Sequence, residues 1–448
     1  MPFPPLSRLR TATRETVGGL PPAFWWLWTS TLVNRLGSFV VTFLALYLTV
    51  DRGFSPAFAG LVASLYGLGG SCAAVAGGVL ADRIGRRPTL LVAQSSTAVA
   101  TMALGLVHPA WAIASAAAVL GFTSNASRPA ISAIMADLVP ARDRVRAFSL
   151  NYWAVNIGFA SSAAMAGLIA AHGYLLLFVG DAGTTLLCAL VVFARIPETR
   201  PEAAPAAVGP SGAAGAPAAA TVGLGSVLRD RGFMALVALT FVLACINNQG
   251  AMALPIVMGR AGYSTTDYGL VVSLNGLLIV LLQIPLTRIV EGRSRIVMLA
   301  VASLLTGCGF GLTAFAGSAW FYALTVTIWT AGEILFTPAS MSLVAELSPV
   351  HARGRHQGVY SLAWSGAAFI APMTAGFLLT VGGPLRHNGD AVWLSCTLLG
   401  AVAAVGYVRL LRRRRSAPAA LPVVLPMVGR TKSWIMSTAS RTSGRKTR

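Results

Sequence analysis

The chain has 448 residues, of which 55% are hydrophobic and only 11% are charged, and its formal net charge is +20. Soluble domains carry about 25% charged residues, so this composition excludes an ordinary soluble protein, whose surface it could not cover. Apolar runs of about 20 residues follow one another along the chain and predict a polytopic, all-α membrane protein.

Twelve membrane-spanning helices are predicted, because about 20 apolar residues in a helix cross the hydrocarbon core of a bilayer. Six of them form an amino-terminal half at 24–195, preceded by residues 1–23, and six form a carboxy-terminal half at 232–411. In chain order the apolar runs lie at 24–50, 56–80, 88–107, 110–136, 147–171, 174–195, 232–258, 268–290, 296–316, 319–345, 358–381 and 390–411.

The basic residues are distributed unevenly around these helices. Most of the 34 lysines and arginines lie before the first helix, in every second connection and after the last helix. Only Arg52, Arg260 and Arg386 lie in the alternate connections, while Arg35 and Arg128 lie inside helices. By the positive-inside rule both termini are cytoplasmic, and we expect a multi-pass protein of the plasma membrane. This asymmetry explains the net charge without nucleic acid as a partner.

Residues 196–231 interrupt the apolar pattern between the two halves. They are rich in Ala, Pro and Gly, which is typical of a flexible linker, and they follow an even number of helices, which places them in the cytoplasm. Residues 412–448 form a basic tail of low complexity, which we also expect in the cytoplasm.

The two halves repeat each other. GLVASLYGL begins at Gly60 and GLVVSLNGL begins at Gly269, and seven of the nine positions match across this spacing of 209 residues. A second set of residues recurs at the same spacing, namely Pro129, Asp137, Pro140 and Arg144 as Pro338, Glu346, Pro349 and Arg353. A parallel duplication of six helices is typical of one large class of transporters.

The connection between the second and third predicted helices is charged, although apolar sequence flanks it. Its sequence, GGVLADRIGRRPTL at 77–90, places Asp82 and Arg83 at the end of one helix and Arg86 and Arg87 at the start of the next. Glycines permit a tight turn between the helices, and a carboxylate is favourable near a helix amino terminus. Arginines at the membrane edge can pair with carboxylates on another helix.

From Gly78 to Leu90 this sequence resembles the signature of the same loop in the major facilitator superfamily, and in particular in its drug/proton antiporter branch. The resemblance implies twelve helices in two repeats and transport by alternating access. It also implies that charged residues latch the cytoplasmic ends of the helices and separate when the protein changes state. We expect Asp82, Arg86 and Asp137 to stabilise the outward-open state.

The second half repeats the acid, the base and the second acid of this set 209 residues later. Because arginines alone would serve topology, the repeated acids indicate a functional role. The predicted cytoplasmic gate therefore comprises Asp82, Arg83, Arg86, Asp137 and Arg144 from the first half and Glu291, Arg295, Glu346 and Arg353 from the second.

Polar residues inside the predicted helices are few, and within a membrane such residues usually face a cavity. Glu333 is the first candidate for a proton carrier and Asp181 the second, because a carboxylate in a low-dielectric cavity can take up and release a proton as access alternates. Arg35 and Arg128 permit an anionic substrate, whereas the two carboxylates permit a cationic one. The predicted substrate cavity near the bilayer midplane is lined by Asn34, Arg35, Asn125, Arg128, Asn247, Asn248 and Gln249.

Three functions are compatible with these features. The main interpretation is a proton-coupled exporter of small drug-like or amphipathic compounds, the alternative is uptake or facilitated transport of a metabolite, and a non-transporting sensor is a remote third. Isolated cysteines, histidines without ligand spacing and no phosphate-binding glycine loop give no basis for an enzyme, a metal site or a cofactor. The expected partners are a small-molecule substrate, protons and the lipid bilayer, and we expect a monomer.

Overall fold

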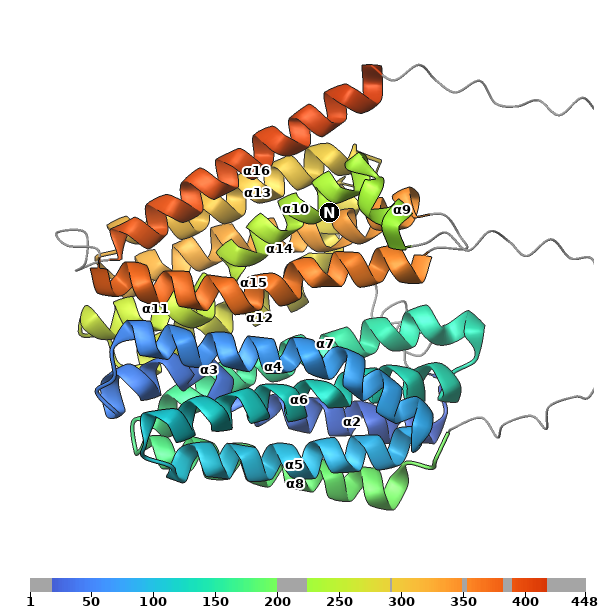
Figure 1. Ribbon diagram of the computed structural model, residues 1–448, viewed down its shortest axis with the longest axis vertical. Helices are drawn as coiled ribbons and strands as arrows, with labels where there is room; N and C mark the ends of the chain where they lie inside the picture. Colours follow the sequence, from blue (N-terminus) through green and yellow to red (C-terminus); the bar gives the residue numbers. More distant parts are fainter. Residues whose placement is uncertain (1–17, 200–223, 291, 349–352, 382–388, 417–448) are drawn as a thin grey trace, which may run out of the picture.

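The computed structural model describes residues 18–199, 224–290, 292–348, 353–381 and 389–416. These residues form helices joined by turns (Figure 1). The first half contains α2 (Pro22–Leu36), α3 (Phe39–Leu46), the π-helical η1 (Tyr47–Asp51), α4 (Pro56–Arg83), α5 (Arg86–Leu106), α6 (Ala110–Leu138), η2 (Ala141–Asp143), α7 (Arg144–Ala170) and α8 (Tyr174–Arg195). The second contains α9 (Leu224–Arg229), α10 (Arg231–Asn247), α11 (Gln249–Arg260), α12 (Thr265–Val290), α13 (Arg295–Leu312), η3 (Thr313–Phe315), α14 (Ala319–Leu347), α15 (Arg353–Val381) and α16 (Asp390–Ser416).

Eleven segments of the described chain are long and apolar enough to cross a membrane. The twelfth predicted segment corresponds to α6, which has 29 residues but is not among the eleven. Several polar residues, among them Asn125, Arg128 and Asp137, lower its hydropathy. Because α6 packs against both α4 and α5, it belongs to the same bundle, and its crossing of the membrane stays a prediction.

Several helices begin at residues that satisfy the free backbone N–H groups of a first turn. Ser55 precedes α4 and accepts a hydrogen bond from the backbone of Phe58, and Pro56 follows it at the first helical position. Asp230 accepts hydrogen bonds from two backbone nitrogens at the start of α10. Such caps and first-turn prolines mark the helix starts in the sequence itself.

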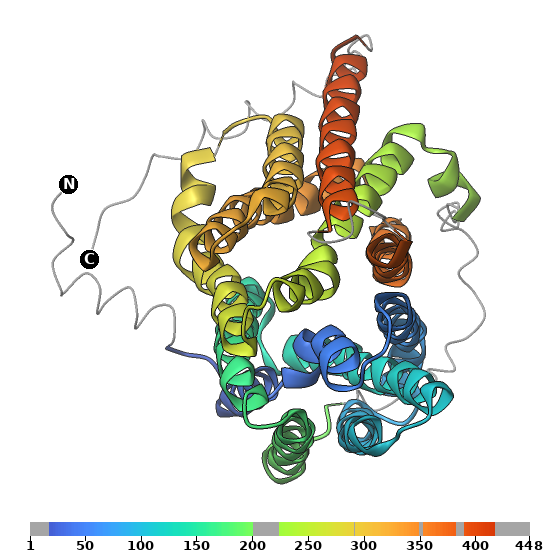
Figure 2. The same cartoon turned by 90° about the vertical axis from the view of Figure 1, so that its left-hand side faces the viewer.

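The two halves lie side by side (Figures 1 and 2). Helices α5 and α8 lie on the side of the first half that faces away from the second, and α13 and α16 lie on the outer side of the second half. The halves contact each other mainly through α4 with α15 and through α7 with α12, and also through α3 with α11.

The repeated segments at Gly60 and Gly269 occupy equivalent places at the interface between the halves. A Cβ atom on Gly60 would lie 2.4 Å from the carbonyl oxygen of Pro372 on α15. A Cβ atom on Gly269 would lie 2.4 Å from the carbonyl oxygen of Ala163 on α7. The missing side chains therefore let helices of opposite halves meet backbone to backbone, which gives the sequence repeat a structural reason.

The helices have one end rich in arginine, which we call the arginine-rich end; it includes Arg83, Arg146 and Arg195. The halves are joined at the opposite end, where the backbone N–H of Ala57 on α4 donates to Oγ1 of Thr380 on α15 at 3.1 Å. Near the arginine-rich end, added Cβ atoms on Gly78 of α4 and Gly358 of α15 would have no atom of another described segment within 4 Å. The ribbons of α4 and α15 also diverge toward the arginine-rich end (Figure 1).

The largest buried cluster spans both halves, and aromatic residues join them within it. Phe43 on α3 packs edge-on against Tyr268 on α12, with 5.2 Å between the ring centroids. The hydroxyl of Tyr268 also donates to the backbone carbonyl of Thr42 at 3.2 Å. A smaller cluster of the first half, around Phe24, lies near the arginine-rich end.

The first membrane-spanning segment of each half, Pro22–Asp51 and Arg231–Arg260, contains a local break. Gly37 and Ser38 separate α2 from α3, and Asn248 separates α10 from α11. A side chain at Gly37 has no space, since a Cβ atom there would lie 1.8 Å from Oγ1 of Thr184 on α8. Pro255 in α11 cannot donate a hydrogen bond to the preceding turn, which weakens the helix there.

Most of the predicted linker and of the predicted tail lies outside the described residues. Within the linker range, the structure describes the segment up to Thr199, which packs on the first half, and the short helix α9 at Leu224–Arg229. Helix α16 continues to Ser416, five residues past the predicted end of the last helix.

Candidate functional site

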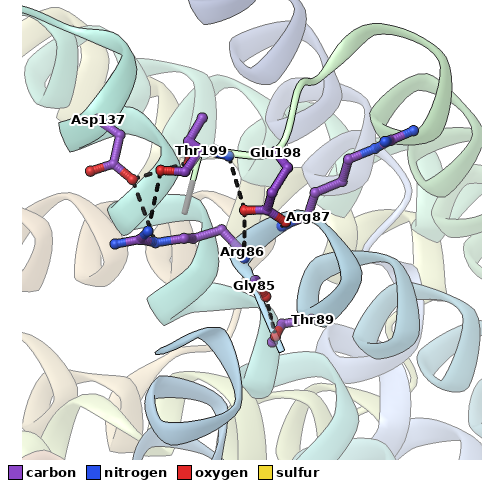
Figure 3. A network of polar contacts seen from close by, with 7 residues as sticks. All are labelled: Gly85, Arg86, Arg87, Thr89, Asp137, Glu198 and Thr199. Atoms are coloured by element: carbon purple, nitrogen blue, oxygen red, sulfur yellow. Dashed lines mark hydrogen bonds and ion pairs between the residues drawn. The ribbon is translucent and has the colours of Figure 1, made fainter. Parts of the chain in front are cut away.

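A carboxylate from outside the predicted loop caps the charged loop of the first half. Oε1 of Glu198 accepts a hydrogen bond from the backbone nitrogen of Arg86 at 3.0 Å, and Oε2 accepts one from that of Arg87 at 3.1 Å (Figure 3). Gly85 makes this approach possible, because it adopts a positive φ of 105° and a Cβ atom on it would lie 2.6 Å from Oε2 of Glu198. The glycine and the acid together begin α5.

The guanidinium of Arg86 lies between the end of α6 and the segment that follows α8. Its Nε lies 3.5 Å from Oδ2 of Asp137, and its Nη1 donates to the backbone carbonyl of Thr199 at 3.2 Å. The hydroxyl of Thr199 donates to the same Asp137 oxygen at 3.0 Å (Figure 3). The side chain of Arg86 is only 13% exposed. The structure thus brings together two of the predicted gate residues, Arg86 and Asp137, and adds Glu198 and Thr199.

The contacts of Glu198 and Thr199 were not predicted, because both residues fall within the sequence assigned to a flexible linker. A signal was present: an acid and a hydroxyl follow the sixth helix directly, on the same side of the membrane as the charged loop. Arg87 adds a further contact to this region, since its Nη2 donates to the backbone carbonyl of Phe193 and its guanidinium lies over the Phe193 ring.

Of the other predicted gate residues of the first half, Asp82 and Arg144 make no hydrogen bond or ion pair with these four described residues. Asp82 and Arg83 are exposed at the end of α4, and Asp82 has no hydrogen bond or ion pair with the residues that the structure describes. Arg144 at the start of α7 donates from Nε to the backbone carbonyl of Val139 at 3.3 Å. The gate roles of these three residues stay predictions.

The second half has the corresponding ion pair. Nη1 of Arg295 lies 2.5 Å from Oε2 of Glu346, and the two side chains are 50% and 45% exposed. Glu291 lies outside the described residues, and the side chain of Arg353, which begins α15, lies outside them as well. Arg295 and Glu346 therefore form an ion pair like that of Arg86 and Asp137, but their side chains are more exposed to solvent.

Near this second ion pair the structure has a cavity of about 640 Å³. Its walls include Arg293, Arg295, Glu346 and Leu411. In the first half the chain after α8 fills the corresponding place with Glu198 and Thr199, whereas in the second half α16 continues as a helix past this point. The two charged loops are therefore equivalent in their ion pairs and different in their surroundings.

The predicted proton carrier Glu333 lies on α14 and is half-buried. Its Oε2 accepts a hydrogen bond from Nδ2 of Asn275 at 3.0 Å, and the same nitrogen lies 3.0 Å from Oγ1 of Thr330. Asn275 precedes Gly276, where a Cβ atom would lie 2.8 Å from the carbonyl oxygen of Asn156 on α7. Glu333 therefore contacts Asn275, whose neighbour in the chain, Gly276, lies at the interface between the halves.

The second proton-carrier candidate, Asp181, is in a different setting. It is 8% exposed on α8, and its Oδ2 accepts a hydrogen bond from the backbone nitrogen of Val40 at 3.1 Å. Val40 lies in the first turn of α3, directly after the break in the first helix. Ser38, at the capping position, donates its hydroxyl back to the carbonyl of Asn34 at 2.9 Å and does not cap α3. Asp181 of another helix supplies this cap.

The predicted cavity residues divide into two groups. The amides of Asn125, Asn248 and Gln249 donate to backbone carbonyls one turn earlier on their own helices, and Asn34 donates to Oγ1 of Thr185 at 3.5 Å. Such bonds satisfy these amides within the protein itself. The described residues leave Oδ1 of Asn247 and Oε1 of Gln249 without a hydrogen bond, and they form no hydrogen bond with the side chains of Arg35 and Arg128.

A model of the Major Facilitator Superfamily matches residues 27–372 of the chain. The uncharacterized MFS-type transporter YqjV of Bacillus subtilis is 22% identical over 371 residues, which are 82% of this chain and 88% of that protein. The Na(+), Li(+), K(+)/H(+) antiporter of Planococcus maritimus is 24% identical, with 75% of this chain and 84% of that protein covered. The multidrug resistance protein MdtH of Cronobacter sakazakii is 24% identical, with coverages of 82% and 88%.

Solved structures of transporters have the same fold. A POT family transporter in complex with 5-aminolevulinic acid gives a TM-score of 0.67 at 18% identity, and 88% of this chain and 96% of that chain are covered. The nucleoside transporter NupG gives a TM-score of 0.71 at 14% identity, with coverages of 87% and 99%. At these identities the similarity concerns the fold.

Proposed function

The chain belongs to the Major Facilitator Superfamily, and we propose that it is a proton-coupled transporter that exports small drug-like or amphipathic compounds across the plasma membrane. It is a multi-pass membrane transporter of small molecules and not an enzyme. In the proposed organisation, two six-helix halves at 24–195 and 232–411 are joined by a cytoplasmic linker at 196–231. Both termini are cytoplasmic, and the transporter acts as a monomer.

The environment of Glu333 carries the proposal of proton coupling. The carboxylate lies fourteen residues into α14, about 21 Å along a helix of 29 residues at about 1.5 Å per residue. Its hydrogen-bond partner is the neutral amide of Asn275, and it forms no ion pair with a described basic residue. A carboxylate at this depth without a cation can exchange a proton as access alternates, because its charged form is not held by an arginine or lysine.

The arrangement of the halves supports alternating access. They are joined at the end opposite the arginines and separate at the arginine-rich end. Since the positive-inside rule places arginines in the cytoplasm, this arrangement corresponds to an inward-open state. In the outward-open state the arginine-rich ends close, and the exposed gate residues Asp82, Arg83 and Arg144 come near the opposite half. Glu291 and Arg353 of the second half take part in the same closure.

Export is the proposed direction because two relatives have names that fit it. MdtH is a multidrug resistance protein, and the Planococcus maritimus protein is an antiporter that uses protons. Uptake or facilitated transport of a metabolite is the alternative function, and a non-transporting sensor is the third. The experiment below distinguishes these three functions.

The test uses everted membrane vesicles with an acidic interior and a lumenal pH dye. Ethidium, a fluoroquinolone, deoxycholate and benzoate are added in turn to vesicles that contain the wild type, Glu333→Gln or the control Asp51→Asn. The Asp51 side chain is exposed at the end of the protein opposite the arginine-rich end. We expect at least one compound to release lumenal protons with the wild type and the control but not with Glu333→Gln. Compound movement without proton movement would favour facilitated transport, and movement of neither would favour a sensor.

A further inference from the structure

We propose that three hydroxyl groups of α12, on Thr265, Thr266 and Tyr268, form a latch that holds the outer end of the protein closed. The outer end is the end opposite the arginines, where the two halves are joined. This inference rests on the proposed inward-open state of an alternating-access transporter. It identifies the groups that favour this state and is independent of the substrate, the direction of transport and the proton coupling.

Two contacts between the halves at the outer end have equivalent backbones. A Cβ atom on Gly60 of α4 would lie 3.1 Å from the Cα atom of Gly376 on α15. A Cβ atom on Gly269 of α12 would lie 3.0 Å from the Cα atom of Gly167 on α7. The two pairs of glycines are related by the same spacing of 209 residues. In both places the missing side chains let helices of opposite halves approach closely.

The side chains beside these glycines differ between the two contacts. Thr265, Thr266 and Tyr268 begin α12. The positions 209 residues earlier, at the start of α4, hold one proline and two alanines. Helix α4 therefore packs against the opposite half without these hydroxyls, and the hydroxyls add contacts that the close approach of the helices does not require.

The two threonines donate to one carbonyl group of the first half. Oγ1 of Thr265 and Oγ1 of Thr266 lie 3.1 and 3.3 Å from the carbonyl oxygen of Gly167, which has two lone pairs to accept them. Gly167 lies in the last turn of α7, where carbonyl groups lack a partner in a following turn. The backbone nitrogen of Asp267 donates to Oγ of Ser264 at 3.1 Å, and this cap fixes the first turn of α12. Both threonines are therefore held in place for the opposite half.

Tyr268 connects the outer parts of the two broken helices, α3 and α11. Its side chain is 1% exposed, and its ring packs edge-on against Phe43. Its hydroxyl oxygen lies 3.2 Å from the carbonyl oxygen of Thr42 on α3 and 3.4 Å from that of Gly250 on α11. The shorter contact joins the first half, and the longer one lies within the second half. When the halves part, Gly250 can accept the hydrogen bond, so opening leaves no buried donor unpaired.

These hydrogen bonds between the halves require a closed outer end. The three donors lie on the second half, and their acceptors, Thr42 and Gly167, lie on the first. A contact that one of two states makes and the other lacks shifts the equilibrium by its net free energy. Because water or Gly250 replaces the lost acceptors on opening, each hydroxyl contributes only modestly. The latch therefore favours the inward-open state and still lets the protein leave it.

Pulsed electron paramagnetic resonance on the purified full chain in lipid nanodiscs tests this proposal without substrate or ion gradient. One pair of spin labels, at Ala171→Cys and Ala261→Cys, reports the outer end, and a second pair, at Arg142→Cys and Gly225→Cys, reports the arginine-rich end. Each pair has one label in each half, and all four positions are exposed. The parent protein carries Cys72→Ser and Cys308→Ser, because both of these cysteines are exposed.

The variants remove the hydroxyls and keep the shape of the side chains. The triple variant combines Thr265→Val, Thr266→Val and Tyr268→Phe. We expect it to raise the ratio of outward-open to inward-open molecules about tenfold, so that the outer labels move apart while the labels at the arginine-rich end approach each other. Tyr268→Phe alone should shift the ratio less, because Gly250 replaces Thr42 as the acceptor of this hydroxyl on opening.

Matched variants separate the latch from a general loss of packing. Thr265→Ser with Thr266→Ser keeps both donors and should keep the distances of the parent. Thr325→Val removes a hydroxyl that donates within α14, and Tyr407→Phe removes a buried one on α16, at the outer side of the second half. Unchanged distances in the triple variant, separation of both label pairs, or an equal shift in these two controls overturns the proposal. The vesicle experiment with Glu333→Gln measures proton movement and these distances do not, so each proposal can fail without the other.

Discussion

Oδ2 of Asp181 on α8 accepts a hydrogen bond at 3.1 Å from the backbone nitrogen of Val40 in the first turn of α3. This contact gives a broken membrane helix the cap that its own Ser38 does not provide. Inside a bilayer no bulk water replaces a missing backbone partner, so a break of this kind requires a side chain from a neighbouring helix. Asp181 therefore has a structural task that the sequence, which indicated a proton carrier, does not reveal.

The two roles of Asp181 predict different mutant behaviour. Asp181→Asn keeps an oxygen that accepts from Val40, so we expect stability close to that of the wild type. Asp181→Ala leaves a buried N–H without a partner and should cost about 1–3 kcal/mol. Thermal unfolding of both variants in detergent measures this difference. If Asp181→Asn remains stable yet abolishes proton release as Glu333→Gln does, Asp181 is a proton carrier in addition to a cap.

Gly85 and Glu198 should be coupled in stability. Gly85→Ala forces a side chain into a positive φ, at about 1–2 kcal/mol, and displaces the Glu198 carboxylate. Glu198→Ala removes the cap of α5, at about 1 kcal/mol. In the double variant the displaced carboxylate is already absent, so we expect a loss smaller than the sum of the two single losses. A double-mutant cycle of unfolding midpoints measures this coupling, and strict additivity would contradict the contact.

The two ion pairs at the arginine-rich end should differ in strength. Arg86 is 13% exposed and contacts both Asp137 and Thr199, so Arg86→Ala should cost about 2–3 kcal/mol. The Arg295–Glu346 pair is about half exposed, and Arg295→Ala should cost less than about 1 kcal/mol, with the effect reduced further by salt. Unfolding at low and high ionic strength compares them. An equal cost in both variants would show that burial does not set the difference.

Gly60 should control closure at the end opposite the arginines. Gly60→Ala places a methyl group 2.4 Å from the Pro372 carbonyl oxygen, so the halves cannot meet there as they do in the structure. Spin labels introduced by Ala57→Cys and Thr380→Cys should then lie farther apart than in the parent, as measured by pulsed electron paramagnetic resonance. Gly358→Ala is the matched control, because a Cβ atom there contacts no other described segment. The same label distance in all three proteins would refute this role for Gly60.

The sequence alone determined the features that depend on composition, periodicity and spacing. Apolar length predicted the membrane helices, the arginine distribution predicted which ends lie together, and the repeat at Gly60 and Gly269 predicted two equivalent halves. The loop signature indicated a charged set of Asp82, Arg86 and Asp137, and the structure pairs two of its members, Arg86 and Asp137. Such features are readable because a helix in a bilayer needs a fixed apolar length and because the ends of successive helices alternate between two surfaces.

Only the tertiary structure decided which polar groups meet across the bundle. Val40 and Asp181 are 141 residues apart, and Arg86 and Glu198 are 112 residues apart. Whether such residues touch depends on how each helix is rotated and how closely its neighbours approach, and glycines such as Gly37 and Gly85 control that approach through contacts with distant side chains. Composition carries no information about rotation, so the helix break, its cap and the contacts of Tyr268 required the packed structure.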